Sequence, residues 1–483
     1  MPKDLNMAEL MKRAPVALPL VVDLDGTLIH SDLLWEAILI FIKTRFLQLW
    51  RLPFWLLQGK AGFKDKLASM IEIDPSALPY DQILLADLAR QRSQGRLLVL
   101  ATGSQRRYAD VIAAHLGLFE RVFASEGGVN LTAHSKARQL SAAVGAKGFD
   151  YIGNATVDIA VWNACNDAFS VTRKPFLLAG GSKTQLAGTS RAGWGRPLIK
   201  AMRPRQWLKN LLVFVPMLAG HALNMPVFLQ ALVAFVAFSL CASSAYLLND
   251  ALDAVDDRRH PVKCHRPIAA GSLPLPVALL ASPLLAIVAL GICAVFDPLL
   301  LLVVVVYFIT TLAYSIHLKR LLMVDIVTLA ILYTLRILGG SAVTHIEPSF
   351  WLLAFSFFIF LSLALLKRYS ELFNLERQGK EKTNGRSYTT MDKAPIGIMG
   401  VNSGFISLLV FMLYFNSENV LVLYTHPHFL LGIVPLLVFW LGRLWTLSFR
   451  GEVNEDPVLY VSRDPISLCI IAACMLLAVG ASM

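Results

Sequence analysis

The sequence predicts two folds in one chain: an α/β domain with a parallel sheet, followed by an all-α polytopic membrane domain of about nine transmembrane helices. From residue 206 onward, apolar stretches long enough to cross a bilayer recur up to the C-terminus. Before residue 206, short apolar strands alternate with helical patterns, as in a sheet that is covered by helices. Basic residues gather in every second loop between the apolar stretches, which is the distribution that the positive-inside rule describes.

The α/β domain is expected to span residues 1–180. Short apolar runs with the character of buried strands lie at 20–22, 97–101 and 149–153. A helical cap of about 30–90 separates the first two of these strands. Its segment 33–58 is apolar, so a spanning helix is one interpretation. However, the charges within it and Pro53 favour a cap whose aromatic face lies on the membrane or on the second domain.

A linker rich in Gly, Ser and basic residues is expected at 181–202, and the membrane domain at 203–483. The expected spans are 206–222, 227–248, 274–295, 299–316, 322–343, 349–366, 395–415, 420–442 and 464–482. The basic loops are 249–273, 317–321, 367–394 and 443–463. We expect these loops and the N-terminal domain in the cytoplasm, and the C-terminus outside it. The polar N-terminus shows no signal peptide, which agrees with this topology.

The composition narrows the class of partner. The chain carries a net charge of +11, yet only 16% of its residues are charged and 56% are hydrophobic. Anionic lipid headgroups and phosphate substrates are therefore the expected partners, and nucleic acid is not. The six cysteines form no CxxC pair or metal-ligand spacing, so they are read as small apolar side chains.

The motif DLDGT at residues 23–27 follows the first strand. Of two aspartates at a strand end, one can attack phosphorus while the other moves protons for the leaving group and then for water. Such a site needs Mg²⁺, because a bare carboxylate does not approach a phosphate dianion.

At this point the N-terminal 180 residues resemble the haloacid dehalogenase (HAD) superfamily of phosphatases. The resemblance implies a Rossmann-like fold in which Asp23 is the nucleophile and Asp25 the acid/base. It also implies that Thr102 in VLATGS binds phosphoryl oxygens and that Lys136 offsets phosphate charge. The implied ligands of one Mg²⁺ are Asp23, Asp25 and Asp158, with Asn154 as an additional candidate; Lys147 is the second candidate for the lysine role. A domain that has lost activity and serves as a scaffold is the alternative.

A second acidic motif lies in NDALDAVDDRRHPVKCHRPIAAG at residues 249–271. On a helix, Asp250, Asp253 and Asp257 would project from one face. Three packed carboxylates repel one another unless cations join them, so Mg²⁺ that bridges them to a diphosphate is the predicted arrangement. Lys263 and Arg266 follow and add charge for the same phosphates. A solvated acidic loop is the alternative interpretation.

This run, which begins at Asn249, resembles the first Asp-rich motif of the UbiA superfamily of intramembrane transferases. A second such motif would be expected after the sixth span, but residues 367–388 contain no DxxxD pair. In detail, the chain resembles the decaprenyl-phosphate phosphoribosyltransferase branch, which moves 5-phosphoribose from phosphoribosyl diphosphate (PRPP) to a polyprenyl phosphate. The stretches that carry this similarity are 203–220, 249–271, 313–326, 334–340 and 367–372.

The resemblance implies that Asp250, Asp253 and Asp257 serve catalysis and hold Mg²⁺. A lipid phosphate is already a competent nucleophile, so the site needs cations more than it needs a base. The candidates are Arg203, Arg205, Lys209, Lys319, Arg336, Lys367 and Arg368, with Tyr314 and Tyr369 to position substrate. Alternatives remain: a helix-packing ion pair for Arg336, aromatic packing for the tyrosines, and interfacial anchoring for Arg205 and Lys209.

The predicted function is therefore Mg²⁺-dependent transfer of phosphoribose to a polyprenyl (decaprenyl) phosphate, after which the N-terminal domain removes the 5-phosphate. The branch implies a multi-pass protein of a bacterial inner membrane, surrounded by membrane lipids, and leaves a homo-oligomer open. The rival function is transfer of a prenyl group from its diphosphate to an aromatic acceptor. A transporter or scaffold is the third alternative, and it predicts no dependence on Mg²⁺.

Overall fold

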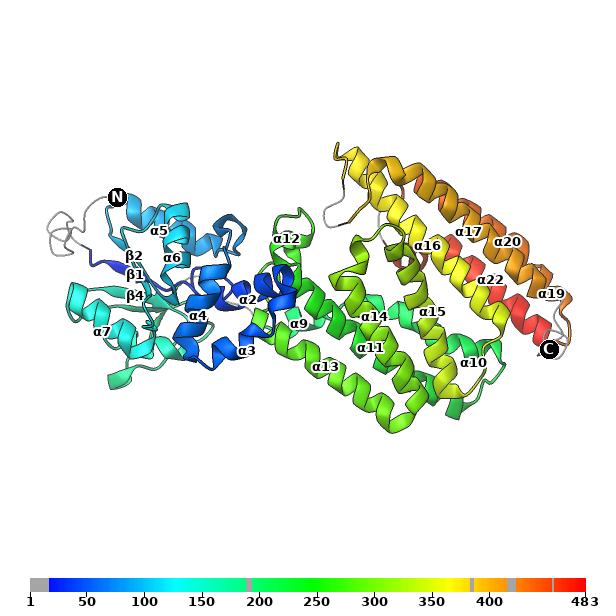
Figure 1. Ribbon diagram of the computed structural model, residues 1–483, viewed down its shortest axis with the longest axis horizontal. Coiled ribbons are helices and arrows are strands. Elements are labelled where there is room, and N and C mark those ends of the chain that lie inside the picture. The colour runs from blue at the N-terminus through cyan, green and yellow to red at the C-terminus, as the bar shows by residue number, and fades with distance from the viewer. Residues whose placement is uncertain (1–16, 188–192, 383–385, 415–422, 454–455) are drawn as a thin grey trace. The chain divides into compact units, whose positions relative to one another are not determined.

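The computed structural model describes residues 17–187, 193–382, 386–414, 423–453 and 456–483. The polar N-terminus and parts of the expected linker, basic loops and 420–442 span lie outside these residues. The chain divides into two compact units, which are drawn in Figure 1. The first unit is Met1–Ala201 with Leu247–Ala281, and the second is Met202–Tyr246 with Ser282–Met483.

A six-stranded parallel sheet forms the centre of the first unit. Its strand order is β3-β2-β1-β4-β5-β6, so β1 lies between β2 and β4. The three expected strands are confirmed by β1, β2 and β4. The bounds are β1 Leu20–Val22, β2 Leu98–Gln105, β3 Arg121–Ser125, β4 Asp150–Gly153, β5 Ala168–Ser170 and β6 Gln185–Leu186. Strand β6 lies within the expected linker 181–202, so the sheet extends beyond residue 180.

Both faces of the sheet are buried under helices. Successive side chains of a strand point to opposite faces, and accordingly Leu20 and Val22 join one hydrophobic cluster while Val21 joins another. The first cluster includes side chains of α5 and α6, and the second includes side chains of α7 and α8. Burial on both faces is typical of parallel sheets. The helices are α5 Gln82–Ser93, α6 Arg106–Leu116, α7 Ala133–Val144 and α8 Ile159–Trp162.

The insert between β1 and β2 is helical, as predicted, and it contains no helix long enough to span a membrane. Helix α2 has 12 residues and α3 has six. Asp32 caps the start of α2 by accepting hydrogen bonds from the N–H groups of Leu34 and Trp35. The elements are α2 Leu33–Thr44, η1 Phe46–Gln48, α3 Arg51–Leu56, α4 Gly59–Met70 and η2 Pro75–Ala77.

The acidic segment belongs to the first unit in terms of its contacts. Here α11 ends at Leu252, and two short helices follow, α12 (Ala254–Arg258) and η6 (Lys263–His265). Gly271 packs so closely against the insert that a Cβ atom at this position would lie 2.2 Å from His30 Cβ. Its φ of +71° also lies in the left-handed region that favours glycine.

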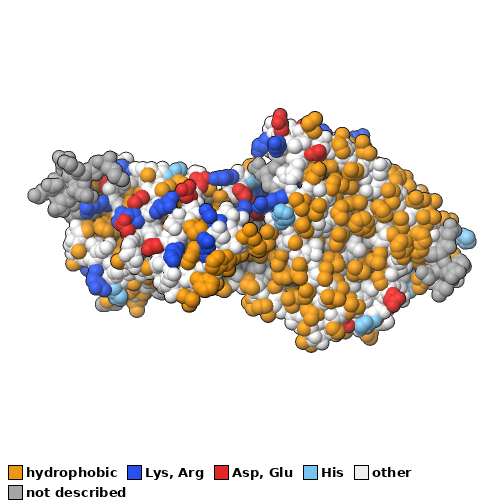
Figure 2. All heavy atoms as spheres, viewed as in Figure 1, with side chains coloured by type: hydrophobic (Ala, Val, Ile, Leu, Met, Phe, Trp, Pro, Cys, Tyr) orange, Lys and Arg blue, Asp and Glu red, His pale blue; other side chains and the backbone are white. Residues whose placement is uncertain are grey.

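Long apolar helices make up most of the remaining chain. Eight helical stretches among the described residues are long and apolar enough to cross a membrane. Figure 2 shows hydrophobic side chains spread over the surface of these helices. The helices are α11 Met225–Leu252, α13 Leu275–Phe296, α14 Pro298–Ile316, α15 Val324–Thr344, α16 Phe350–Arg377, α17 Lys393–Tyr414, α19 His428–Leu431 with α20 Ile433–Phe449, and α22 Pro465–Ser482. Shorter elements are α9 Gly195–Ala201, η7 Leu318–Arg320, η8 Thr390–Asp392 and α21 Pro457–Val461.

The expected span at 206–222 does not form one long helix in the described residues, so it is not among these eight. This stretch forms the 3-10 helix η5 (Pro204–Phe214) and the five-residue helix α10 (Val215–Ala219). Pro216 lies at the start of α10, where its missing N–H is tolerated. Lys209 and Asn210 of η5 are buried, so this stretch is partly polar and faces protein, which hydropathy alone does not show.

Candidate functional site

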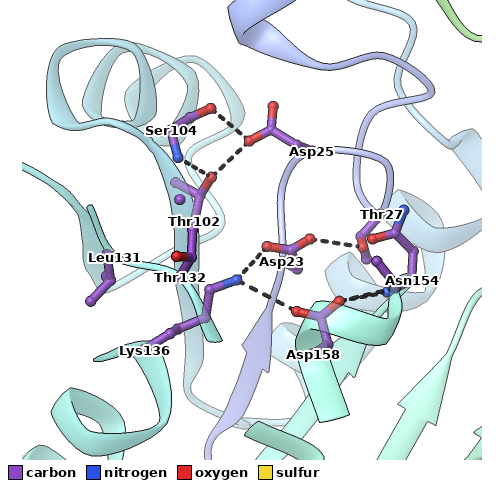
Figure 3. Close-up of polar contacts among 12 residues, drawn as sticks. Asp23, Asp25, Thr27, Thr102, Ser104, Leu131, Thr132, Lys136, Asn154 and Asp158 are labelled. Atoms are coloured by element: carbon purple, nitrogen blue, oxygen red, sulfur yellow. Dashed lines mark hydrogen bonds and ion pairs between the residues drawn. The ribbon is translucent and has the colours of Figure 1, made fainter. Parts of the chain in front are cut away.

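Asp23 lies at the carboxyl end of β1, where it pairs with a buried lysine (Figure 3). Lys136 Nζ, on α7, lies 2.7 Å from Asp23 Oδ1 and 3.7 Å from Asp158 Oδ1. Asp158 ends a 3-10 turn that follows β4, and all three side chains are buried. Because β1 and β4 are neighbours, their carboxyl ends bring together Asp23 and Asp158, and Lys136 reaches both from α7.

Burial controls the charge of this centre. It raises the pKa of Asp23 to about 7, with Asp158 and Asp25 acting in the same direction and Lys136 opposing them. Burial alone would lower the pKa of Lys136, but the carboxylates of Asp23 and Asp158 outweigh it and raise that pKa. The site is therefore built around positive charge, and an additional cation would favour the ionised, nucleophilic form of Asp23.

Asp25 is held by the strand and the insert together. Its Oδ2 accepts hydrogen bonds from Thr102 Oγ1 at 2.9 Å and from Ser104 Oγ at 2.6 Å. Its Oδ1 accepts one from the N–H of Leu33, the first residue of α2, at 2.8 Å. Thr102 thus lies at the site, as expected, although its hydroxyl is bound to Asp25. Ser104 was missed, although it lies in the same VLATGS motif.

The two additional candidates of this domain, Asn154 and Lys147, lie in different surroundings: Asn154 is at the site and Lys147 is not. Asn154 follows β4 and lies against Gly26, where a Cβ atom would be 2.1 Å from Asn154 Nδ2. The N–H of Asn154 also donates to Asp158 Oδ2 at 3.1 Å. Lys147 instead donates to the carbonyl of Cys165 at 2.6 Å. The geometry therefore favours Lys136 over Lys147 for the lysine role.

A lysine of the insert also reaches this centre. Lys64 Nζ, on α4, donates to the carbonyl of Gly103 at 2.7 Å and to Asn130 Oδ1 at 3.1 Å. Burial lowers the pKa of Lys64, although Asp25 and Asp32 oppose the shift. Sequence reasoning missed Lys64, because neither a motif nor its spacing shows which face of the insert covers the sheet.

Of the three aspartates expected to bind Mg²⁺, two surround the ammonium group of Lys136 and the third lies apart from it. Asp25 is bound to Thr102, Ser104 and Leu33, whereas Asp23 and Asp158 share Lys136. Across the described residues, no group of three or more His, Cys, Asp or Glu side chains is arranged to hold a metal ion. Asp23 and Asp158 supply the hard oxygen donors that suit Mg²⁺, and they already enclose one positive charge.

The acidic segment shows the same arrangement. Asp250 lies at the end of α11 and Asp257 on α12, and both are buried. Arg266 Nη1 lies 3.1 Å from Asp250 Oδ1 and 2.7 Å from Asp257 Oδ2. Burial raises the pKa of Asp257, against the effect of Arg266. Two buried carboxylates thus converge on a single cation, an arrangement that also fits a divalent metal.

Asp253 does not join this pair. Lys43 Nζ, on α2, lies 3.5 Å from Asp253 Oδ1 and 2.6 Å from Asp256 Oδ2. The prediction of three aspartates on one helical face assumed a continuous helix. However, α11 ends at Leu252 and Asp253 has φ −94° and ψ 4°, which interrupts the helical phase. Asn249 lies in the last turn of α11, and Lys263 is exposed in η6.

A buried ion pair attaches the acidic segment to the insert. Arg258 Nη2, on α12, lies 2.5 Å from Glu36 Oε1 on α2, and both side chains are almost fully buried. Ser31 Oγ donates to the same Glu36 oxygen. The Arg258 guanidinium also donates to the carbonyls of Ala77 and Ala269. One side chain therefore joins the segment that carries Asp257 to the insert whose Leu33 contacts Asp25.

In the second unit, an unpredicted carboxylate lies between two nominated lysines. Lys209 Nζ lies 2.6 Å and Lys367 Nζ 3.2 Å from Asp456 Oδ2. Burial would raise the pKa of Asp456, but Lys367 and Lys209 outweigh it and hold that pKa below its usual range. The available signal was a lone acidic stretch, NEDP, in a basic loop beside a span.

Arg336 is buried among neutral partners. Its Nε donates to Asn210 Oδ1 at 2.7 Å and its Nη2 to Tyr307 OH at 2.9 Å. Its guanidinium carbon also lies 5.5 Å from the ring centroid of Tyr333. Arg336 forms no ion pair with a carboxylate in the described part of the chain, which argues against the ion-pair alternative.

Other nominated residues of this unit have structural surroundings. Arg368 is fully buried, 2.5 Å from Asp325 and in contact with Glu371, so two carboxylates already balance its charge. Tyr369 packs its ring against Trp445 and Phe449, as the aromatic-packing alternative predicts. The remaining candidates lie elsewhere: Arg203 and Arg205 around the start of η5, Tyr314 in the last turn of the span α14, and Lys319 in η7 just after that span.

The apolar helices and the polar groups at their ends define a multi-pass membrane protein. The sequence profile of the UbiA prenyltransferase family matches residues 211–461. An uncharacterized protein of Sinorhizobium fredii, y4nM, is 34% identical over 458 residues, which cover 93% of this chain and 88% of that protein. The chain therefore belongs to the UbiA prenyltransferase family.

Two other relatives match shorter parts of the chain. The nodulation protein NoeC of Azorhizobium caulinodans is 33% identical over 280 residues, 56% of this chain and 89% of that protein. The decaprenyl-phosphate phosphoribosyltransferase of Mycobacterium tuberculosis is 39% identical over 199 residues, 40% of this chain and 66% of that protein. Part of this chain is thus similar to decaprenyl-phosphate phosphoribosyltransferases.

The Glu36–Arg258 pair provides a stability prediction. Glu36→Gln leaves a buried guanidinium without its counter-charge, which should cost about 3–5 kcal/mol. In the full-length chain, amide hydrogen exchange across residues 250–271 should accelerate. The control, Glu72→Gln, removes the partner of Arg107 in an exposed pair and should cost at most about 1 kcal/mol. Equal exchange in the two variants would show that the pair does not hold the segment.

Proposed function

We propose that this chain transfers 5-phosphoribose from PRPP to a polyprenyl phosphate such as decaprenyl phosphate in a Mg²⁺-dependent reaction. We further propose that its N-terminal domain then removes the 5-phosphate from the product. The pair Asp250 and Asp257 around Arg266 carries the first proposal, together with the 39% identity to a decaprenyl-phosphate phosphoribosyltransferase. Membrane lipids surround the second unit, and PRPP and the lipid phosphate are the proposed substrates.

The leaving diphosphate needs positive charge beside it. Asp250 and Asp257 would hold Mg²⁺, which supplies that charge when bound. Arg266 is held by the same two carboxylates, so it is placed to donate hydrogen bonds to a phosphate once a metal takes over their charge. Lys263 is exposed on the following turn and adds to the positive field. Asp253 would join the metal ligands only if it left Lys43, so it is the weaker of the three nominated carboxylates.

The acceptor, a polyprenyl phosphate, needs cations beside its phosphate group more than it needs a base. An oxygen of the lipid phosphate attacks ribose C1 while the C1–diphosphate bond breaks, so a strong base is unnecessary. The lipid anion requires cations in a surrounding of low polarity. Within the second unit, Arg336 is the best candidate, because it is buried and bonded to neutral groups. Lys209 and Lys367 would contribute if a phosphate replaced Asp456 between them.

The proposed phosphatase reaction uses the Asp23 centre. The ionised carboxylate of Asp23 attacks phosphorus, and Asp25 donates a proton to the leaving oxygen and later accepts one from water. Lys136 holds Asp23 and offsets phosphate charge. The parallel sheet and the location of these groups at strand ends support the HAD resemblance. Asp23 and Asp158 are the proposed ligands of a second Mg²⁺.

Both reactions are proposed to occur on one side of the membrane. The basic loops and the N-terminal domain would be cytoplasmic by the positive-inside rule. The contact between Arg258 and Glu36 supports this proposal, because it places the acidic segment and the N-terminal domain in a single compact unit. The 5-phosphorylated product would then be released on the side where Asp23 acts.

Family membership favours a second candidate function, prenyl transfer from a prenyl diphosphate to an aromatic acceptor. The same two carboxylates would serve that diphosphate. The absence of a DxxxD pair from the 367–388 sequence counts against it. The identity of the accepted donor separates the two functions.

The donor assay uses the purified full-length chain and Mg²⁺ in two arms: labelled PRPP with a polyprenyl phosphate, and a labelled prenyl diphosphate with an aromatic acceptor. We expect transfer from PRPP only, and complete loss of transfer when EDTA removes the metal. Asp250→Asn should lower the transfer rate by about 100-fold or more, because it removes a proposed metal ligand. Asp256→Asn, an exposed change in the same segment, should lower it less than about 5-fold. Transfer from the prenyl diphosphate alone would refute the proposal in favour of the rival.

The fate of the 5-phosphate tests the N-terminal domain. Asp23→Asn removes the proposed nucleophile, so the variant should accumulate a lipid product that is heavier by one phosphate and should form it at an unchanged rate. Mass spectrometry of the extracted lipid checks this expectation. Asp110→Asn on the surface of α6 is the control and should give the dephosphorylated product. If Asp23→Asn still yields that product, the phosphatase assignment fails.

A further inference from the structure

The insert of the N-terminal domain carries an exposed apolar patch. Figure 2 shows it as an orange area over the region of α3. Its members, which lie on η1, α3 and the turns around them, are exposed to between 54% and 88%: Phe46 54%, Leu47 88%, Trp50 61%, Phe54 60%, Leu56 61% and Leu57 84%. We refer to these six side chains as the apolar patch. Exposed apolar groups that gather in this way mark an interaction surface.

The patch rests on a packed support. Trp55 lies within α3 but faces inward and is 8% exposed. Its ring centroid lies 5.5 Å from that of Phe41 on α2, in an edge-to-face contact. Phe63 of α4 belongs to the same hydrophobic cluster. The inward face of the insert is thus packed, while the six outward side chains remain exposed.

The charged residues around the apolar patch indicate what kind of surface it would bind. From Ala37 to Lys64 the sequence contains no Asp or Glu but five basic residues. Lys43 and Lys64 have partners within the unit. Arg45 and Lys60 are exposed, and the guanidinium carbon of Arg51 lies 5.4 Å from the ring centroid of Trp50. A surface that combines aromatic and aliphatic side chains with basic residues alone is complementary to anionic lipid headgroups over an apolar interior.

We propose that the apolar patch docks into the interfacial layer of a bilayer that contains anionic lipids. The partner is always at hand, because this chain is itself a multi-pass membrane protein and the N-terminal domain is tethered to the bilayer. Trp50 and Phe54 enter at headgroup depth, while Arg45, Arg51 and Lys60 contact lipid phosphates. Docking of the patch concerns only where the N-terminal domain is bound and is independent of the proposed reactions.

Site-directed spin labelling of the full-length chain in lipid nanodiscs tests this proposal. Cys264, Cys469 and Cys474, the cysteines that are not buried, are first replaced by serine. Labels are then placed at Leu47→Cys or Leu57→Cys. The matched control is Ile83→Cys, an apolar side chain on α5 that is 67% exposed. For each label, collision with oxygen, which enters lipid, is compared with collision with a polar nickel chelate, which does not.

In nanodiscs with phosphatidylglycerol, the oxygen-to-nickel ratio at residues 47 and 57 should exceed that at residue 83 several-fold. Substitution of Arg45, Arg51 and Lys60 by Gln should lower the ratio at residue 47. A ratio at residue 47 equal to that at residue 83 would show that the patch faces water and would overturn the proposal. Exclusion of both reagents at residue 47 would also overturn it, because a protein surface would then cover the patch.

Discussion

A carboxylate that is removed from water needs a positive partner, and this constraint organises the charged centres of the protein. Asp23 has Lys136, the pair Asp250 and Asp257 has Arg266, and Glu36 has Arg258. In the second unit, Asp456 lies between two lysines. Burial of any of these carboxylates without its positive partner would cost far more free energy than burial of the pair. At the Asp23 centre and at the pair Asp250 and Asp257, we propose that a metal ion or a phosphate replaces one half of an existing pair.

The Glu36–Arg258 pair gives the acidic segment its place in the first unit. Arg258 bonds to Glu36 and to the carbonyl of Ala77, so its helix is fixed to two residues of the insert. Because Asp257 is the preceding residue, the position of a proposed diphosphate ligand depends on the N-terminal domain. This dependence gives a physical reason for the fusion of the two halves that is separate from any passage of product between them.

Much of this organisation could be predicted from local sequence. The parallel sheet followed from short apolar strands, and Asp23, Lys136 and Asp158 could be nominated through the resemblance to the HAD superfamily. The contacts that depend on tertiary structure could not. The separation of Asp253 from Asp250 required the end of α11 at Leu252, and no periodicity shows that. Lys64 and Asp456 were missed for the same reason, since burial of a polar side chain depends on what packs over it.

The central claim is that Asp250 and Asp257 exchange Arg266 for a divalent metal that binds a diphosphate. A structure of the full-length chain with Mn²⁺ and PRPP, determined with anomalous scattering from the metal, tests it most directly. The account predicts a manganese peak within coordination distance of both carboxylates, with Arg266 moved onto the diphosphate. Carboxylates that still bind Arg266 at saturating Mn²⁺ and PRPP, with the metal elsewhere or absent, would contradict it.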